Sequence, residues 1–292
     1  MKPPAFEYVR PQTLEEALAA LEAHEDAKVL AGGQSLIPMM NMRLAQPSTL
    51  IDINGLAELS QIQEAPDGLM VGALVRHFQL EQDARIAQFC PVVPEAERLI
   101  AHPAIRTRGT IGGSLSHADP AAELPVLAAL FDWELTVASR GETRVVPASQ
   151  FFLSYFITAL APNEMVTAVK FPRASRLPAA IEEYAIRSGD FALAIAAAAV
   201  DSDAHGRVSV VRMVLGGVGD VPWRSLDLEE SARGETAGPD LWTHLAEEAA
   251  RQIDPADDLH ATADYRRQLA QTLMIQALDR AHQKSVAQRG NS

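Results

Sequence analysis

Hydrophobic and polar positions alternate in several short stretches near the start of the chain, a pattern typical of half-buried strands. The clearest stretches lie at 6–9, 28–31 and 50–53. Between the first two, Thr13-Leu-Glu-Glu16 has the form of a capping box, and apolar residues then follow on one helical face, namely Leu14, Leu18 and Leu21. The pattern therefore predicts a β-α-β unit with a glycine loop after its second strand.

The middle of the chain combines short helices with further strands. Its periodicity predicts strands at 69–73 and 166–171, helices at 76–84 and 94–101, and a hairpin with strands at 133–138 and 143–146. Asp119-Pro120 has the sequence of a helix N-cap followed by proline, so Asp119 is either a cap or a ligand-binding residue. An aromatic group that we expect in the core follows: Phe151, Phe152, Tyr155 and Phe156.

The C-terminal part contains an alanine run that propensity alone would place in a helix, at 192–199. A turn-like segment and a β-branched stretch at 207–215 follow it, so we expect an antiparallel hairpin instead. Apolar residues at every fourth position then predict two amphipathic helices, at 241–253 and 265–277. The tail after Lys284 is expected to fray.

These elements predict an α+β protein of two domains. We expect the first domain at 1–175, divided into a small βαβ subdomain at 1–57 and a larger mixed-sheet subdomain at 58–175. The second domain is expected at 176–288, with a short antiparallel sheet and helices. A length of 292 residues is ample for such an arrangement.

Composition and charge narrow the classes of function. The net charge of −13 argues against a nucleic-acid or anionic-membrane partner, because both require a basic surface. No apolar run approaches the roughly 20 residues that span a bilayer, and the N-terminus lacks the apolar core of a secretion signal, so we expect the cytoplasm. Cys90 is the only cysteine, which excludes an internal disulfide and a cysteine-ligated iron–sulfur cluster.

Two glycine pairs are the candidate ligand-binding features. Gly32-Gly33 and Gly112-Gly113 each follow a short strand-like run, and a serine follows each pair. Glycine tolerates positive φ and close approach of a ligand, and successive N–H groups in such turns can form an anion-binding nest. Two nests suit the two phosphates of a dinucleotide-type cofactor. Each pair alone is as readily an ordinary turn, since neither matches a standard phosphate-binding motif.

The segments around both glycine pairs resemble a specific family. AGGQSLIPMMNMRLAQP at 31–47 and TIGGSLSHADPAAELP at 110–125 are similar to the two flavin-contacting loops of the FAD-binding medium subunit of molybdenum hydroxylases. That group includes xanthine, carbon monoxide and nicotine dehydrogenases. Further similar segments keep the same order and extend the resemblance over nearly the whole chain: IRSGDFALA, LGGVGDVPWR and DYRRQLA.

The resemblance implies a domain of the PCMH type that binds FAD, followed by a domain of the CO dehydrogenase flavoprotein type. It implies a non-covalent site, although a covalent link through His117 is an alternative that the residues themselves leave open. It places Asp119 and Glu123 toward the hydroxyl-bearing chain of the flavin. The full set of expected cofactor-binding residues is Ala31, Gly32, Gly33, Gln34, Ser35, Leu36, Thr110, Ile111, Gly112, Gly113, Ser114, Asp119, Glu123, Val166 and Tyr184.

The resemblance also implies partner chains. A small iron–sulfur subunit would deliver electrons, and a large subunit would hold the molybdenum cofactor and hydroxylate the substrate. The assembly expected is a dimer of heterotrimers, in which this chain passes electrons to an external acceptor. Two other hypotheses stay open: a free-standing FAD-dependent oxidoreductase with its own substrate pocket, and a non-catalytic structural subunit.

Overall fold

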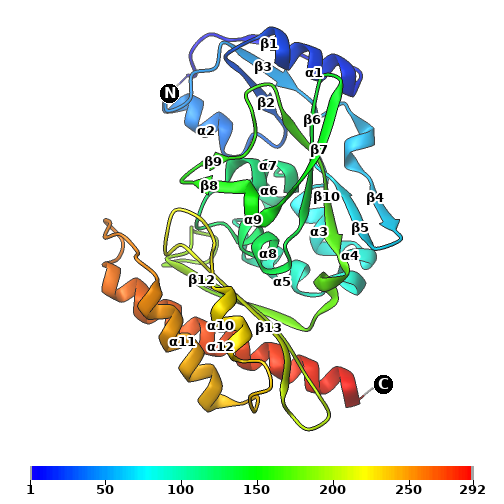
Figure 1. Cartoon of the computed structure of the whole chain (residues 1–292). Helices are drawn as coiled ribbons and strands as arrows, with labels where there is room; N and C mark the ends of the chain where they lie inside the picture. The colour runs from blue at the N-terminus through cyan, green and yellow to red at the C-terminus, as the bar shows by residue number, and fades with distance from the viewer. Residues whose placement is uncertain (1, 291–292) are drawn as a thin grey trace.

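A small parallel sheet forms the N-terminal tier of the computed structural model, which describes residues 2–290 (Figure 1). Its strands lie in the order β1-β3-β2. The elements in chain order are β1 (Glu7–Val9), α1 (Leu14–Ala23), β2 (Ala27–Leu30), α2 (Leu36–Asn41) and β3 (Thr49–Asp52). Thr13 caps α1 by accepting a hydrogen bond from the N–H of Glu16 (3.2 Å), and Leu18, Leu21 and Ile51 are buried together. The predicted β-α-β unit is confirmed.

The second tier is a five-stranded sheet in the order β4-β5-β10-β6-β7. We expected a mixed sheet here, but every strand pairing in it is antiparallel. The short and largely exposed edge strand β4 was not predicted. The strands are β4 (Ile62–Ala65), β5 (Gly68–Gly72), β10 (Met165–Pro172), β6 (Glu134–Ser139) and β7 (Glu142–Pro147).

Short helices cover this sheet and connect its strands. They are α3 (His77–Gln82), α4 (Ala84–Phe89), α5 (Val92–Leu99), α6 (Pro103–Arg106), α7 (Ile111–His117), α8 (Glu123–Phe131) and α9 (Ala148–Phe151). The helix predicted at 76–84 is split in two, because Asp83 ends α3 and its carboxylate caps α4 through the N–H of Arg85 (2.8 Å). Of the two alternatives for Asp119, the cap of a helix that begins at Pro120 is wrong, since α8 begins at Glu123.

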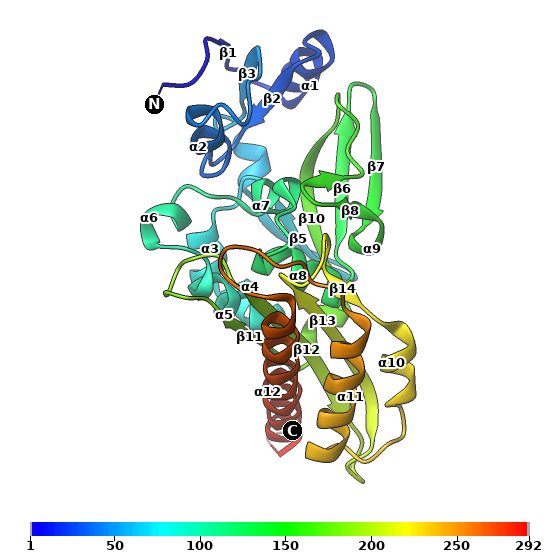
Figure 2. The same cartoon turned by 90° about the vertical axis from the view of Figure 1, so that its left-hand side faces the viewer.

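The third tier is a four-stranded antiparallel sheet carrying long helices on one face (Figure 2). Its strands are β11 (Ala179–Tyr184), β12 (Ala194–Ser202), β13 (Val208–Gly216) and β14 (Trp223–Arg224). The helices are α10 (Leu226–Ser231), α11 (Pro239–Gln252) and α12 (Ala263–Gly290). The α+β class and the order of its parts are as expected.

The alanine run is a strand because both of its faces are buried. Ile195 and Ala197 face the core shared with the second tier, and Ala196 and Ala198 face the core under α11 and α12. Small side chains let helices approach from both sides, which outweighs the helix propensity of alanine. The central hairpin of the third tier, β12 with β13, is thereby confirmed.

Two further expectations are corrected, one about the C-terminal tail and one about the aromatic group. The described part of the tail, from Lys284 to Gly290, does not fray. It belongs to α12, where the hydroxyl of Ser285 donates to Asp201 Oδ1 (3.0 Å) and Arg289 Nη2 donates to Ser202 Oγ (2.9 Å). The aromatic group is only partly core. Phe151 is fully buried, whereas Tyr155 and Phe156 are 56% and 41% exposed in the turn between β8 (Phe152–Ser154) and β9 (Ile157–Thr158).

Candidate functional site

The first glycine loop runs from Ala31 to Leu36, between the end of β2 and the start of α2, and all its residues are half-buried. Gly33 has φ +70°, the left-handed conformation that favours glycine. Within residues 2–290, no hydrogen bond leaves the backbone N–H groups of Gly32, Gly33, Gln34 or Ser35. A run of unpaired donors at a left-handed turn is the geometry of an anion-binding nest.

The second glycine segment is built differently from the nest that we expected. Thr110 to Ser114 is the capped first turn of α7, and Gly112 and Gly113 have no positive φ. Its N–H groups are already used: Ile111 donates to Val75 O (3.1 Å), Gly112 to Ala73 O (3.0 Å) and Gly113 to Thr110 Oγ1 (3.1 Å). Glycine at 112 is required by packing instead, because a Cβ there would lie 2.5 Å from the Cβ of Ala73.

The two glycine segments touch each other. A Cβ on Gly32 would lie 2.4 Å from the carbonyl oxygen of Arg108 and 2.7 Å from the Cα of Gly109, so only glycine fits there. The first loop therefore rests directly on the residues that lead into Thr110. Segments about 80 residues apart in the sequence form one continuous surface.

Asp119 lies in the turn after α7 rather than at the head of a helix. Its Oδ1 accepts a hydrogen bond from the N–H of Ala121 (2.9 Å), and the residue is half-buried. His117, at the end of α7, stacks on Phe156 with ring centroids 4.8 Å apart. Burial lowers the pKa of this imidazole, and the nearby charge of Asp119 opposes the shift. Both side chains lie at the same end of α7, with aromatic rings beside them.

Glu123 is the first residue of α8, and its carboxyl group is buried against Glu183 of β11. Burial, followed by repulsion from Glu183, raises the pKa of Glu123 well above its ordinary value. Burial also raises the pKa of Glu183, while a hydrogen bond from Glu123 opposes that shift. Glu183 Oε2 is buried and has no hydrogen-bond partner among the described residues. Both carboxyl groups therefore favour the neutral form more strongly than an exposed glutamate does.

The remaining two expected residues belong to neither glycine segment. Val166 is 4% exposed on β10, opposite Val137, in the core of the second tier. Tyr184, at the end of β11, is 42% exposed and meets Tyr265 edge-on at 6.3 Å. The structure thus brings the two glycine segments together, puts Asp119 and Glu123 along the chain that follows them, and places Tyr184 beside Glu183.

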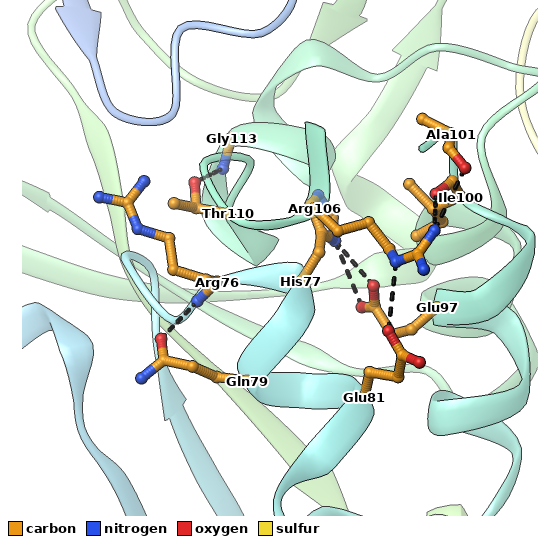
Figure 3. Close-up of polar contacts among 10 residues, drawn as sticks. All are labelled: Arg76, His77, Gln79, Glu81, Glu97, Ile100, Ala101, Arg106, Thr110 and Gly113. Atoms are coloured by element: carbon orange, nitrogen blue, oxygen red, sulfur yellow. Dashed lines mark hydrogen bonds and ion pairs between the residues drawn. The ribbon is translucent and has the colours of Figure 1, made fainter. Parts of the chain in front are cut away.

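Sequence reasoning missed a buried contact behind the second segment, drawn in Figure 3. His77 Nδ1 lies 3.0 Å from Glu97 Oε2, and both side chains are buried. Burial raises the pKa of Glu97, and the charge and hydrogen bond of His77 oppose the shift. A Cβ on Gly109 would lie 2.6 Å from His77 Cδ2. The His77 ring therefore packs against Gly109, the residue that precedes Thr110. No sequence motif links two residues at this spacing.

A second missed group is Asp52-Ile-Asn54, which begins at the last residue of β3. The N–H of Asn54 donates to Asp52 Oδ1 (3.0 Å), and the Asn54 amide reaches the carbonyl of Ala31 (2.8 Å). The Asp-x-Asn-Gly sequence is a turn signal that could have indicated this geometry. Among residues 2–290, no group of three or more His, Cys, Asp or Glu side chains could hold a metal ion, and no helix is long and apolar enough to cross a membrane.

Family models match almost the entire chain. Residues 4–174 match the FAD-binding domain in molybdopterin dehydrogenase, and residues 179–281 match the CO dehydrogenase flavoprotein C-terminal domain. The alpha subunit of the 6-hydroxypseudooxynicotine dehydrogenase complex of Paenarthrobacter nicotinovorans is 38% identical over 96% of both chains. Caffeine dehydrogenase subunit beta of a Pseudomonas species is 37% identical over 98% of both chains.

Solved structures show the same arrangement. A chain of quinoline 2-oxidoreductase from Pseudomonas putida 86 superposes with a TM-score of 0.94 at 35% identity, covering 98% of this chain and 99% of that one. A chain of carbon monoxide dehydrogenase from Hydrogenophaga pseudoflava gives a TM-score of 0.93, also at 35% identity, over 97% and 99% of the two chains. The chain belongs to the FAD-binding medium subunits of molybdenum hydroxylase-type dehydrogenases, and it is an oxidoreductase subunit.

Proposed function

We propose that this chain holds one FAD non-covalently against its two glycine segments and carries electrons from an iron–sulfur subunit to an external acceptor. FAD supplies the redox chemistry, and the protein binds, orients and electrostatically tunes it. The observation that carries the proposal is the direct contact of Gly32 with Arg108 and Gly109. It makes one binding surface from the two segments that resemble flavin-contacting loops.

The residues present fit such a cofactor. The unpaired N–H groups of the first loop and the left-handed turn at Gly33 suit a phosphate. The second segment offers little free backbone, so its contribution is the half-buried hydroxyl of Ser114 and the half-buried backbone of Gly113. The two phosphates of FAD therefore meet unequal partners, with the stronger donor set at the first loop.

The proposed cofactor-binding set keeps all the residues that the family resemblance implied: Ala31 to Leu36, Thr110 to Ser114, Asp119, Glu123, Val166 and Tyr184. The raised pKa of Glu123 favours the protonated form, in which the carboxyl group is a hydrogen-bond donor as well as an acceptor. The proposed domain boundary lies at 175/176, in the 3-10 turn Arg173–Arg176. We propose a dimer of heterotrimers with an iron–sulfur chain and a molybdenum chain, located in the cytoplasm.

The flavin part of the proposal is tested on the tagged full-length chain, purified under mild conditions with whatever chains accompany it. About one FAD per chain is expected from the visible spectrum, and acid precipitation should leave all of it in the supernatant. A colourless complex would contradict the proposal and favour a structural subunit. Flavin that stays on the precipitated chain would contradict a non-covalent site and direct attention to His117.

The electron-transfer part needs a substrate of the complete complex. The names of the relatives indicate compounds to screen, namely N-heterocycles such as nicotine, caffeine and quinoline, aldehydes such as glyceraldehyde, and carbon monoxide. Under anaerobic conditions, the active substrate should bleach the flavin of the complete complex. Without the iron–sulfur chain, the flavin should stay oxidised. Reduction of the isolated chain by substrate would favour the free-standing oxidoreductase instead.

A further inference from the structure

We propose that Arg76 is a positioning residue that fixes the two glycine segments relative to each other, so that one diphosphate can engage both. The inference rests on the proposed function of those segments, and it assigns a specific task to a side chain outside both of them. Arg76 lies between β5 and α3, and its guanidinium group forms hydrogen bonds toward each segment in turn.

Toward the first loop, Arg76 acts through Asn54. Arg76 Nη2 donates to Asn54 Oδ1 (2.7 Å), and Asn54 Nδ2 donates in turn to the carbonyl oxygens of Ala31 (2.8 Å) and Leu30 (3.3 Å). Those carbonyls belong to the residues that enter the glycine pair. The Asn54 amide is oriented by these bonds, because its oxygen must face the donor and its nitrogen the carbonyls.

Toward the second segment, Arg76 acts directly, and the backbone of its two neighbours pairs with the same stretch. Arg76 Nη1 donates to the carbonyl oxygen of Arg108, the same atom against which Gly32 packs. Residues 73–77 also run alongside the segment: His77 N donates to Gly109 O (3.1 Å), and Ile111 N donates to Val75 O (3.1 Å). The guanidinium group thus lies where the two segments meet.

Arg76 is itself held in place. Its N–H donates to Gln79 Oε1 (2.8 Å) at the start of α3, as Figure 3 shows. On the other side, Asp52 Oδ1 accepts from Asn54 N (3.0 Å) and Nδ2 (2.6 Å), and Asp52 Oδ2 accepts from the hydroxyl of Tyr8. The chain of hydrogen bonds therefore runs from Tyr8 in β1 to Arg108, three residues before α7. Planar guanidinium suits this task because it presents two donors in a fixed fork.

The contact differs from other links between the first tier and the rest of the molecule. Arg140 Nη1, for example, pairs with Glu22 of α1 at 3.1 Å, but both side chains are about half exposed and neither touches a glycine segment. Such surface pairs contribute little to stability. Arg76 and Arg140 therefore offer a matched comparison between a link at the cofactor surface and one elsewhere.

The test uses the full-length chain together with the chains that accompany it, stripped of flavin and titrated with FAD. Arg76→Gln should weaken FAD binding by about tenfold or more, since a charged hydrogen-bond donor to both segments is lost. Arg76→Lys should also weaken it, because an ammonium group keeps the charge without the fork. Arg140→Gln should leave the dissociation constant unchanged. The melting temperature of the flavin-free protein should change little in all three variants.

A double-mutant cycle separates positioning from a merely local effect. If Arg76 acts through Asn54, the double variant Arg76→Gln/Asn54→Ala should bind FAD no more weakly than the worse single variant. Additive losses, wild-type affinity in Arg76→Gln, or wild-type affinity in Arg76→Lys would each overturn the inference and leave the proposed function standing. Absence of FAD binding by the wild-type protein would instead overturn the proposed function.

Discussion

Gly32 and Arg108 are in contact so close that no other residue fits at position 32: a Cβ there would lie 2.4 Å from the Arg108 carbonyl oxygen. This packing joins two loops that are distant in the sequence. The two glycines of the first pair therefore have different roles. Gly33 adopts the positive φ that the turn requires, and Gly32 allows the contact between the loops.

Gly32→Ala should therefore push the two segments apart. We expect a loss of about 1–3 kcal/mol in the free energy of unfolding, typical of overpacking, and a marked loss of bound FAD. Gly55→Ala is the matched control, because its Cβ would meet nothing closer than 3.9 Å. Thermal melting and flavin content of both variants measure the effect. Wild-type flavin content in Gly32→Ala would show that the contact between loops does not serve the cofactor.

The buried pair of Glu123 and Glu183 should make stability depend on pH. Both carboxyl groups have raised pKa values in the folded protein, so the stability is greatest below their unfolded pKa and falls as pH rises through the folded values. Glu123→Gln removes the repulsion and keeps a donor to Glu183. We expect this variant to gain stability at neutral pH, on the order of 1–2 kcal/mol, because a tenfold change in proton affinity corresponds to about 1.4 kcal/mol.

The comparison requires chemical denaturation of the flavin-free protein between about pH 4 and pH 8, a range that begins near the ordinary glutamate pKa. The free energy of unfolding of Glu123→Gln should match that of the wild-type protein at the acidic end of this range and exceed it at the alkaline end. Glu58→Gln, at an exposed position, should follow the wild-type curve throughout. A variant that is less stable than the wild-type protein at the alkaline end would contradict the raised pKa values of the pair.

Cys90 should be inert in the folded protein. Its side chain is completely buried, and burial raises the pKa of its thiol far above the ordinary value, so almost no thiolate is available. A thiol reagent should label about one cysteine per chain in denaturant, and far more slowly under native conditions. Rapid labelling of the native protein would show that α5 and its surroundings open readily.

The alanine strand β12 should resist larger side chains. Ala197→Leu introduces a branched side chain between β12 and the shared core, and it should cost about 1–3 kcal/mol of stability. Ala287→Leu, on an exposed position of α12, should be close to neutral. Melting of both variants measures the difference. Equal stability would mean that the space beside β12 is looser than its burial indicates.

Much of the fold could be predicted from local patterns. The capping of α1 by Thr13, the hairpin of β6 with β7, and the strand character of Ala194–Ser202 all follow from signals within a few residues. The start of α8 could not be predicted, because Asp119-Pro120 reads equally as a helix N-cap or as a turn. The structure uses it as a turn, and the carbonyl of Pro120 accepts from Gly217 N (2.8 Å).

The sequence indicated the two glycine segments of the candidate site, but it did not indicate the side chains that hold those segments in place. Both glycine pairs stand out in the sequence, yet the reason for glycine at 112 is the neighbouring Ala73 and not a nest. Glu183 and Arg76 carry no motif, and their roles depend on partners that lie on other elements. Such pairings arise from tertiary packing, which a single sequence does not display.

An experimental structure of the native complex, with its cofactor retained, is the most direct test of whether both glycine segments bind one FAD. We expect the FAD diphosphate to lie against both glycine segments, with one phosphate within hydrogen-bonding distance of the N–H groups at 32–35 and the other beside 112–114. We also expect Arg76 to lie behind the junction of the two segments. Flavin bound elsewhere on the chain, or against only one of the two segments, would contradict joint binding by both segments.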